Sequence, residues 1–168
     1  MKAAYLVATL LCCTYAWSLP SASLDSFERL KALAGEWDAE LPGYGKITNT
    51  IRIVSNGTAI EETIGTPENN EVSLYTLDRA RILLTHFCAM TADGHQVRLE
   101  TADLEGKPGV LRFAFVGATN LHHLSAPHMR ELVFNFIDEA HFSERWTKIE
   151  NGKDTIFDLN FSRRSSAP

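Results

Sequence analysis

Cysteine is scarce in this sequence, with three among 168 residues. Two of them, Cys12 and Cys13, lie in an N-terminal apolar stretch that we expect to be removed from the mature protein. The mature chain then keeps only Cys88 and has no second thiol with which to form an internal disulfide. This excludes the disulfide-rich scaffolds that are common among small secreted proteins. A lone thiol in an exported protein is usually hidden, so we expect Cys88 to be buried.

Basic residues are also in deficit. The sequence has 16 lysine and arginine residues against 21 aspartate and glutamate residues, which gives a formal net charge of −5. Removal of the N-terminal stretch takes away Lys2 and no acidic residue, so the net charge of the mature chain becomes −6. Binding to phosphate backbones and to anionic lipid depends on clustered positive charge. Neither nucleic acid nor a membrane surface is therefore an expected partner.

The apolar run at the N-terminus is too short to cross a bilayer, which needs about 20 residues. It covers residues 3–13, follows Lys2, and precedes Ala16-Trp17-Ser18, where small residues stand at the positions that a signal peptidase reads. We predict a signal peptide over residues 1–18, cleaved near Ser18, and an exported protein in the periplasm or outside the cell, without membrane insertion. Acylation at Cys12 is disfavoured because the preceding Leu11 is bulky.

A short amphipathic helix is predicted at the start of the mature chain, over residues 24–33. Ser23 or Asp25 can cap its N-terminus, and Gly35 follows its end. Four apolar residues fall near helical spacing on one face: Leu24, Phe27, Leu30 and Leu33.

From Glu36 onward the hydrophobic period changes to two, and turn residues recur at intervals typical of antiparallel sheet. This pattern predicts about ten strands, among them 47–54, 72–77, 82–90, 130–138 and 141–149. So many antiparallel strands leave exposed edges unless the sheet closes on itself. We predict an all-β fold, a closed antiparallel β-barrel preceded by the short helix. It forms one domain over residues 24–163 with a frayed polar tail at 164–168.

The strand at 82–90 is apolar enough to be buried, yet it carries a histidine and a thiol. Alternation places five side chains on its inner face: Ile82, Leu84, His86, Cys88 and Met90. His86 and Cys88 are residue types that bind zinc and softer metals, but two ligands do not make a site. Other histidines have spacings that match no regular zinc pattern: His122, His123, His128 and His141. A core histidine beside an inert buried thiol is the favoured interpretation, and no metal or cofactor is expected.

Glu62 lies between Ile60 and Ile64 on what should be an inward face, and Asn49 lies opposite on the preceding strand. An inward carboxylate is costly unless it is paired or protonated, so this pair could anchor the polar group of a ligand. A register shifted by one residue would instead turn Glu61 inward and Glu62 to water. The same two orientations, inward or toward water, are open to the side chain of Glu144. Three arginines are available as partners for such acids: Arg112, Arg130 and Arg145.

Residues 120–129 form the longest stretch without periodicity, and they contain three of the six histidines. Loops at the rim of a barrel commonly carry binding residues, which makes Asn120 and His128 candidates. The alternative is a surface loop whose histidines have no function.

Gly35-Glu36-Trp37, placed after a helix, resembles the Gly-x-Trp motif of the calycin barrels, which include lipocalins, fatty-acid-binding proteins and nitrobindin-type haem barrels. Nearly all of the mature chain resembles an uncharacterised family of exported bacterial proteins with a lipocalin-like barrel. The stretches that carry this second likeness are Leu84 to Ala89, Ala118 to Leu121, His128 to Arg130, and His141-Phe142 with Glu144 and Trp146. The resemblance implies the barrel fold and export, and it adds no catalytic residue.

The sequence favours binding of a small, largely apolar ligand inside the barrel over an enzymatic role. The proposed inner wall is aromatic and aliphatic: Trp37, Ile51, Ile60, Leu84, Phe113, Phe115, Leu132, Phe134 and Phe157. The candidate binding residues are His86, Cys88, Glu62, Asn49, Asn120, His128 and Trp37. Three alternatives stay open. They are haem or metal binding through loop histidines, acid–base catalysis by His86, Glu62 and Asn120, and a filled barrel with a structural role only.

Overall fold

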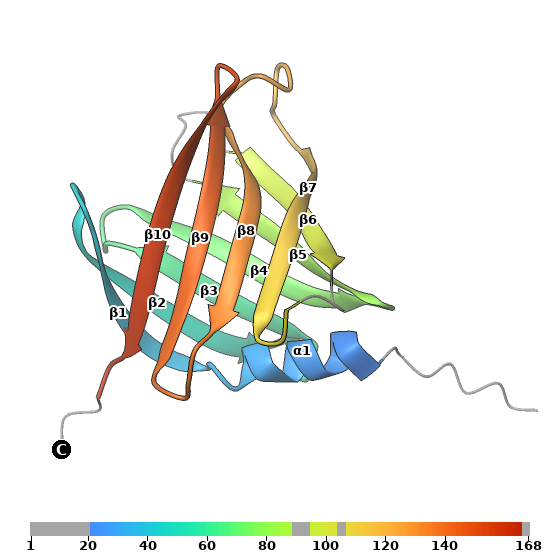
Figure 1. Cartoon of the computed structure of the whole chain (residues 1–168), viewed down its shortest axis with the longest axis vertical. Helices are drawn as coiled ribbons and strands as arrows, with labels where there is room; N and C mark the ends of the chain where they lie inside the picture. The colour runs from blue at the N-terminus through green and yellow to red at the C-terminus, as the bar shows by residue number, and fades with distance from the viewer. Residues whose placement is uncertain (1–20, 89–94, 104–106, 166–168) are drawn as a thin grey trace, which may run out of the picture.

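The computed structural model describes residues 21–88, 95–103 and 107–165, and within them ten strands form one closed antiparallel barrel (Figure 1). Each strand pairs with the next along the chain, and β10 closes the barrel on β1. The elements are α1 Ser21–Lys31, β1 Gly35–Leu41, β2 Gly45–Val54, the 3-10 turn η1 Ser55–Gly57, β3 Ala59–Gly65, β4 Asn70–Asp78, β5 Arg81–Cys88, β6 His95–Asp103, β7 Val110–Ala118, β8 His128–Phe136, β9 His141–Glu150 and β10 Lys153–Arg163. The predicted all-β barrel with a short N-terminal helix is confirmed.

The predicted signal peptide and Met90 lie outside the described residues. Within the described part of the chain, no helix combines the length and the apolar character needed to span a membrane.

The alternation predicted for the histidine-bearing strand is confirmed in β5. Ile82, Leu84, His86 and Cys88 are all buried, whereas Phe87 between the last two is 37% exposed. Burial ends before the last residues of β2, because Ile53, two positions after the buried Ile51 and opposite Ile60, is 47% exposed.

Helix α1 lies across one end of the barrel, the lower end in Figure 1. Phe27, Leu30 and Leu33 are buried in the core there, whereas Leu24 is 39% exposed and does not belong to the packed face. The prediction that Ser23 or Asp25 caps the helix is wrong, because the helix begins at Ser21 and both residues lie inside it. Ser23 is instead buried, and its hydroxyl donates to the carbonyl of Arg79 at 3.3 Å. It thereby ties the helix to the β4–β5 turn.

The interior next to α1 is filled by aromatic rings. Phe142 lies at the centre, with ring centroids 4.7 Å from Trp37, 4.9 Å from Phe134 and 4.7 Å from Phe161. The indole nitrogen of Trp37 donates to the carbonyl of Leu33 at 2.9 Å, which satisfies one of the free carbonyls after the helix. This end of the barrel is therefore a packed core.

Arg163, at the end of β10, connects the helix, the tryptophan and the β8–β9 turn. Its guanidinium lies 4.1 Å from the centroid of the Trp37 ring and donates to the carbonyls of Ala32, Ala34 and Glu139 at 3.0 to 3.3 Å. Carbonyls at the C-terminus of a helix carry partial negative charge, so a cation is favoured in this position.

Replacing Arg163 by methionine should lower the free energy of unfolding by about 2 kcal/mol, because it keeps the apolar stem and removes the charged donors. Urea denaturation measures this difference. Arg145→Met is the matched control, since Arg145 pairs with Asp158 on the exposed outer surface and such pairs contribute little. Equal losses in the two variants would contradict this role of Arg163.

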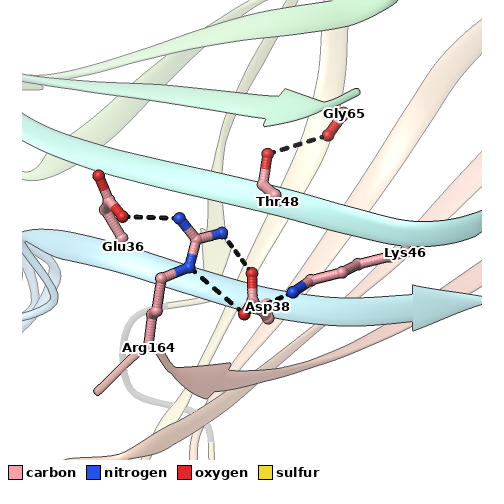
Figure 2. Close-up of polar contacts among 6 residues, drawn as sticks. All are labelled: Glu36, Asp38, Lys46, Thr48, Gly65 and Arg164. Atoms are coloured by element: carbon pink, nitrogen blue, oxygen red, sulfur yellow. Dashed lines mark hydrogen bonds and ion pairs between the residues drawn. The ribbon is translucent and has the colours of Figure 1, made fainter. Parts of the chain in front are cut away.

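The seam between β1 and β10 is reinforced by charged side chains. Figure 2 shows the Arg164 guanidinium between Glu36 and Asp38 of β1, with Lys46 of β2 on the other side of Asp38. The Arg164 amide also donates to the Glu36 carbonyl at 2.9 Å. Hydrogen bonding to Arg164 lowers the pKa of Asp38 below its ordinary value. The polar tail predicted for residues 164–168 is thus anchored at its first residue.

Candidate functional site

A network of polar side chains is enclosed in the barrel between β2, β3, β4 and β9. At its centre is Glu62, which is 1% exposed. The amide nitrogen of Asn49 donates to one carboxylate oxygen of Glu62 at 2.6 Å, and the Tyr75 hydroxyl donates to the other at 2.6 Å. The inward direction predicted for Glu62 is confirmed. The alternative register is excluded, because Glu61 points outward to Arg52.

Glu144 of β9 is a second carboxyl group in this network, and it is also 1% exposed. The Trp146 indole nitrogen donates to its Oε2 at 2.8 Å. Burial raises the pKa of Glu144 well above the ordinary glutamate value, and the negative charge of Glu62 raises it further. Burial and the two carboxyl groups likewise raise the pKa of the Tyr75 hydroxyl well above its ordinary value. Burial in the barrel therefore favours the protonated form of Glu144.

The three arginines considered as partners for these acids do not enter the barrel. Each forms an ion pair with an acidic side chain on the surface: Arg112 with Glu131, Arg130 with Asp154, and Arg145 with Asp158. Protonation of Glu144 and hydrogen bonding, rather than a cation, are what accommodate the buried carboxyl pair.

His86 extends the network along β4 and β5. Its Nδ1 lies 3.1 Å from the Ser73 hydroxyl oxygen, and its Nε2 lies 3.3 Å from a carboxylate oxygen of Glu71. Its ring contacts the Trp146 ring, with the centroids 4.6 Å apart and the planes tilted by 35°. Both His86 and Ser73 are at most 1% exposed. Contacts with Trp146 link this group to Glu144, so the buried polar residues form one connected network.

Cys88 is the next inward residue of β5, and its burial is confirmed at 7% exposure. Its thiol donates to the other carboxylate oxygen of Glu71 at 3.5 Å. One ligand atom from each of Glu71, His86 and Cys88 lies within 4.8 Å of the other two. Imidazole, thiol and carboxylate thus converge at one point of the inner wall.

A partly open cavity of about 120 Å³ lies at the barrel end opposite to α1. We call this end the mouth. Apart from Gly65, Asn69 and Glu71 the cavity wall is apolar or aromatic: Leu41, Tyr44, Ile47, Ile64, Met129, Trp146, Phe157 and Leu159. Glu71 and Trp146 belong both to this wall and to the polar network. The mouth cavity therefore ends on the buried polar groups.

Three buried polar atoms of the network make no hydrogen bond among the described residues: Asn49 Oδ1, His86 Nε2 and Glu144 Oε1. Buried polar groups in proteins are nearly always paired, so each such atom calls for an explanation. Their presence in one network beside a cavity marks this part of the barrel as the candidate site.

The structure brings together four of the seven residues predicted for the site. Asn49, Glu62, His86 and Cys88 belong to the buried network. Trp37 lies at the opposite, packed end of the barrel. Of the nine residues predicted for the inner wall, Phe157 is the one that borders the mouth cavity among its described lining residues.

The loop residues predicted for the site are not among the described lining residues of the mouth cavity. Asn120 is exposed in a left-handed conformation with φ of 56°, and His122 and His123 are exposed as well. His128 is buried at the start of β8, where its ring contacts Phe115 at 4.7 Å and its Nδ1 lies 2.7 Å from the Ala126 carbonyl oxygen.

Sequence reasoning missed Glu71, Ser73 and Tyr75, which are the inward residues of β4. The apolar residues Val72 and Leu74 alternate with them and would be expected to point inward. The polar face turns inward because its partners lie there: Ser73 is opposite His86, and Tyr75 reaches Glu62. The signal available in the sequence was the hairpin formed by these two strands, because its pairing places Ser73 opposite His86.

The fold and site define a closed ten-stranded antiparallel barrel with one packed end and one end that holds a cavity over buried polar groups. Comparison of the sequence with protein-family models gives no match, and comparison with curated proteins gives no similar sequence. Membership of the exported lipocalin-like family thus remains a prediction from the resemblance.

Proposed function

We propose that the barrel binds a small, largely apolar molecule in the mouth cavity. The observation that carries this proposal is an apolar wall that ends on a polar network with unpaired buried atoms. Ligand sites in proteins have this composition, with mostly apolar linings and a few placed polar groups. We also propose, from the predicted signal peptide, that the protein is exported.

The size of the cavity limits the ligand. An apolar cavity of about 150 Å³ is known to hold benzene, so about 120 Å³ holds one small ring or a short aliphatic chain. Because the cavity is partly open, a longer molecule would leave its remainder at the rim.

Glu71 is the acidic residue among the described cavity-lining side chains, and it restricts which polar group the ligand can carry. A carboxylate accepts hydrogen bonds and repels anions. An alcohol, phenol or amine therefore fits the cavity better than a carboxylic acid of the same size. This chemistry separates the proposal from fatty-acid binding.

Thermal unfolding with a matched panel tests the proposal in the presence of a chelator. Benzyl alcohol and benzylamine should raise the melting temperature more than benzoate, through binding to the folded state. Leu159→Trp fills the cavity and should abolish these shifts. Ile156→Trp changes the same strand on its outer face, where Ile156 is 57% exposed, and should retain them.

Native mass spectrometry of protein from its own host adds a second measurement, the mass of any small organic molecule that co-purifies. No bound molecule, together with unchanged melting temperatures across the panel, would contradict ligand binding and favour the filled barrel. Shifts that persist in Leu159→Trp would place binding elsewhere.

A further inference from the structure

We propose that Glu71, His86 and Cys88 form a site for a divalent transition metal of the zinc class, with one coordination position facing the mouth cavity. The three side chains come from adjacent strands, β4 and β5. Val72 is opposite Phe87 in this ladder, so Glu71 and Cys88 come next to each other on the inner face. The site does not depend on the proposed ligand.

The donor set selects the metal. Imidazole nitrogen, thiolate sulfur and carboxylate oxygen are the three ligand types of protein-bound zinc. A thiolate ligand disfavours calcium and magnesium, which prefer oxygen. Zn²⁺ also balances the charge, because the negative charges of one thiolate and one carboxylate equal the positive charge of the ion.

The environment of His86 is a second, independent observation. Its ring is 1% exposed, and its Nε2 has no hydrogen bond in the described part of the structure. When Nδ1 carries the proton and donates to Ser73, Nε2 presents its lone pair toward Glu71 and Cys88. A hydrogen bond from the other ring nitrogen is how proteins orient metal-binding histidines. An ion bound between Nε2 and the Glu71 carboxylate, which lies 3.3 Å away, would use the lone pair of this buried atom.

The separations suit coordination by one ion. Zinc ligands at roughly 2.0 to 2.3 Å from the ion stand about 3.3 to 3.8 Å apart in a tetrahedron. The His86–Glu71 contact of 3.3 Å and the Cys88–Glu71 contact of 3.5 Å are made to different oxygens of the Glu71 carboxylate, and the remaining nitrogen–sulfur pair lies within 4.8 Å. Closing that last distance by about 1 Å requires a small side-chain rotation.

Three protein ligands leave a fourth position for water or for a polar group of a bound molecule, as in catalytic zinc sites. Glu71 lines the mouth cavity, and so does Trp146, which the His86 ring contacts. The fourth position can therefore be reached from solvent through the mouth.

Titration with cobalt chloride and zinc chloride tests the site in the absence of organic ligands. Cys12 and Cys13 are replaced by serine in every sample, so that Cys88 is the single thiol. We expect one equivalent of Co²⁺ to give a thiolate-to-cobalt charge-transfer band in the near ultraviolet and tetrahedral d–d bands in the visible. Zn²⁺ should displace the cobalt and raise the melting temperature.

Variants distinguish the three ligands from Ser73, which orients His86. Cys88→Ser should remove the charge-transfer band, and Glu71→Gln and His86→Gln should each abolish stoichiometric binding. Ser73→Ala should retain the spectrum but weaken Zn²⁺ affinity by about 10-fold to 100-fold. Circular dichroism reports whether each variant folds, and Ser73→Ala provides a test that keeps all three ligands.

The matched control is Glu68→Gln, which removes a carboxylate from the exposed β3–β4 connection and should leave binding unchanged. Binding without a charge-transfer band would overturn the proposal, as would affinity that Cys88→Ser and Glu71→Gln do not reduce. The panel of organic ligands is measured with chelator present. An absence of melting-temperature shifts in that panel would therefore not change any of these metal-binding outcomes.

Discussion

Replacing Glu62 by alanine is expected to lower the free energy of unfolding by about 4 kcal/mol, one of the largest losses for a single side chain in this barrel. The substitution leaves the Asn49 amide and the Tyr75 hydroxyl as buried donors without their acceptor. Each such donor costs about 1 to 3 kcal/mol, and the lost side chain also leaves a void. Urea denaturation at neutral pH measures the difference.

Glu61 provides the matched control, because it is the same residue type one position earlier on the same strand. It points outward and pairs with Arg52, and 27% of its side chain is exposed. Glu61→Ala should therefore cost less than about 1 kcal/mol. Similar losses in the two variants would contradict the buried network around Glu62.

Glu144 is expected to make the protein less stable as the pH rises. Below the ordinary glutamate pKa of 4.5 the folded and unfolded chains both carry this proton. Above it the unfolded chain loses the proton while the folded chain keeps it, because burial raises the pKa of Glu144 in the barrel. The folded state then binds more protons, so this group lowers the free energy of unfolding with rising pH until the raised pKa is passed.

Glu144→Gln removes this titration and keeps a neutral group of the same shape. Relative to the unsubstituted protein, the variant should gain stability as the pH rises above the ordinary glutamate pKa of 4.5, with a slope of at most about 1.4 kcal/mol per pH unit. Urea denaturation at several pH values gives this slope. Glu150→Gln, at the exposed end of the same strand, is the control and should show no such gain. If the difference in free energy of unfolding between Glu144→Gln and the unsubstituted protein did not change with pH, the raised pKa of Glu144 would be refuted.

The barrel could be predicted from sequence because its strands obey the rule of alternation over most of their length. That rule placed Glu62, His86 and Cys88 inside correctly, since each is flanked by apolar residues two positions away. It failed for β4, where polar residues pair inside the barrel and the apolar alternation points outward. A pattern within one strand does not contain the identity of its cross-strand partners, so Glu71 could not be assigned to the site.

Long-range contacts account for the other differences. Trp37 belongs to the packed end because Arg163 and the end of α1 meet on its indole, and these groups are far apart in the sequence. The anchoring of Arg164 likewise depends on carboxylates of β1.

The seam between β1 and β10 also determines the order in which the molecule can be assembled. Within the described barrel, every other strand pair joins neighbours in the chain, so these hairpins can form while synthesis continues. β1 is the first strand to leave the ribosome and β10 is the last, and Trp37 cannot pair with Arg163 until both are present. Closure therefore has to wait for the synthesis of β10, and it has the highest contact order of the strand pairings in the described barrel. A nascent chain therefore presents the open edge of β1 to chaperones and proteases until β10 arrives.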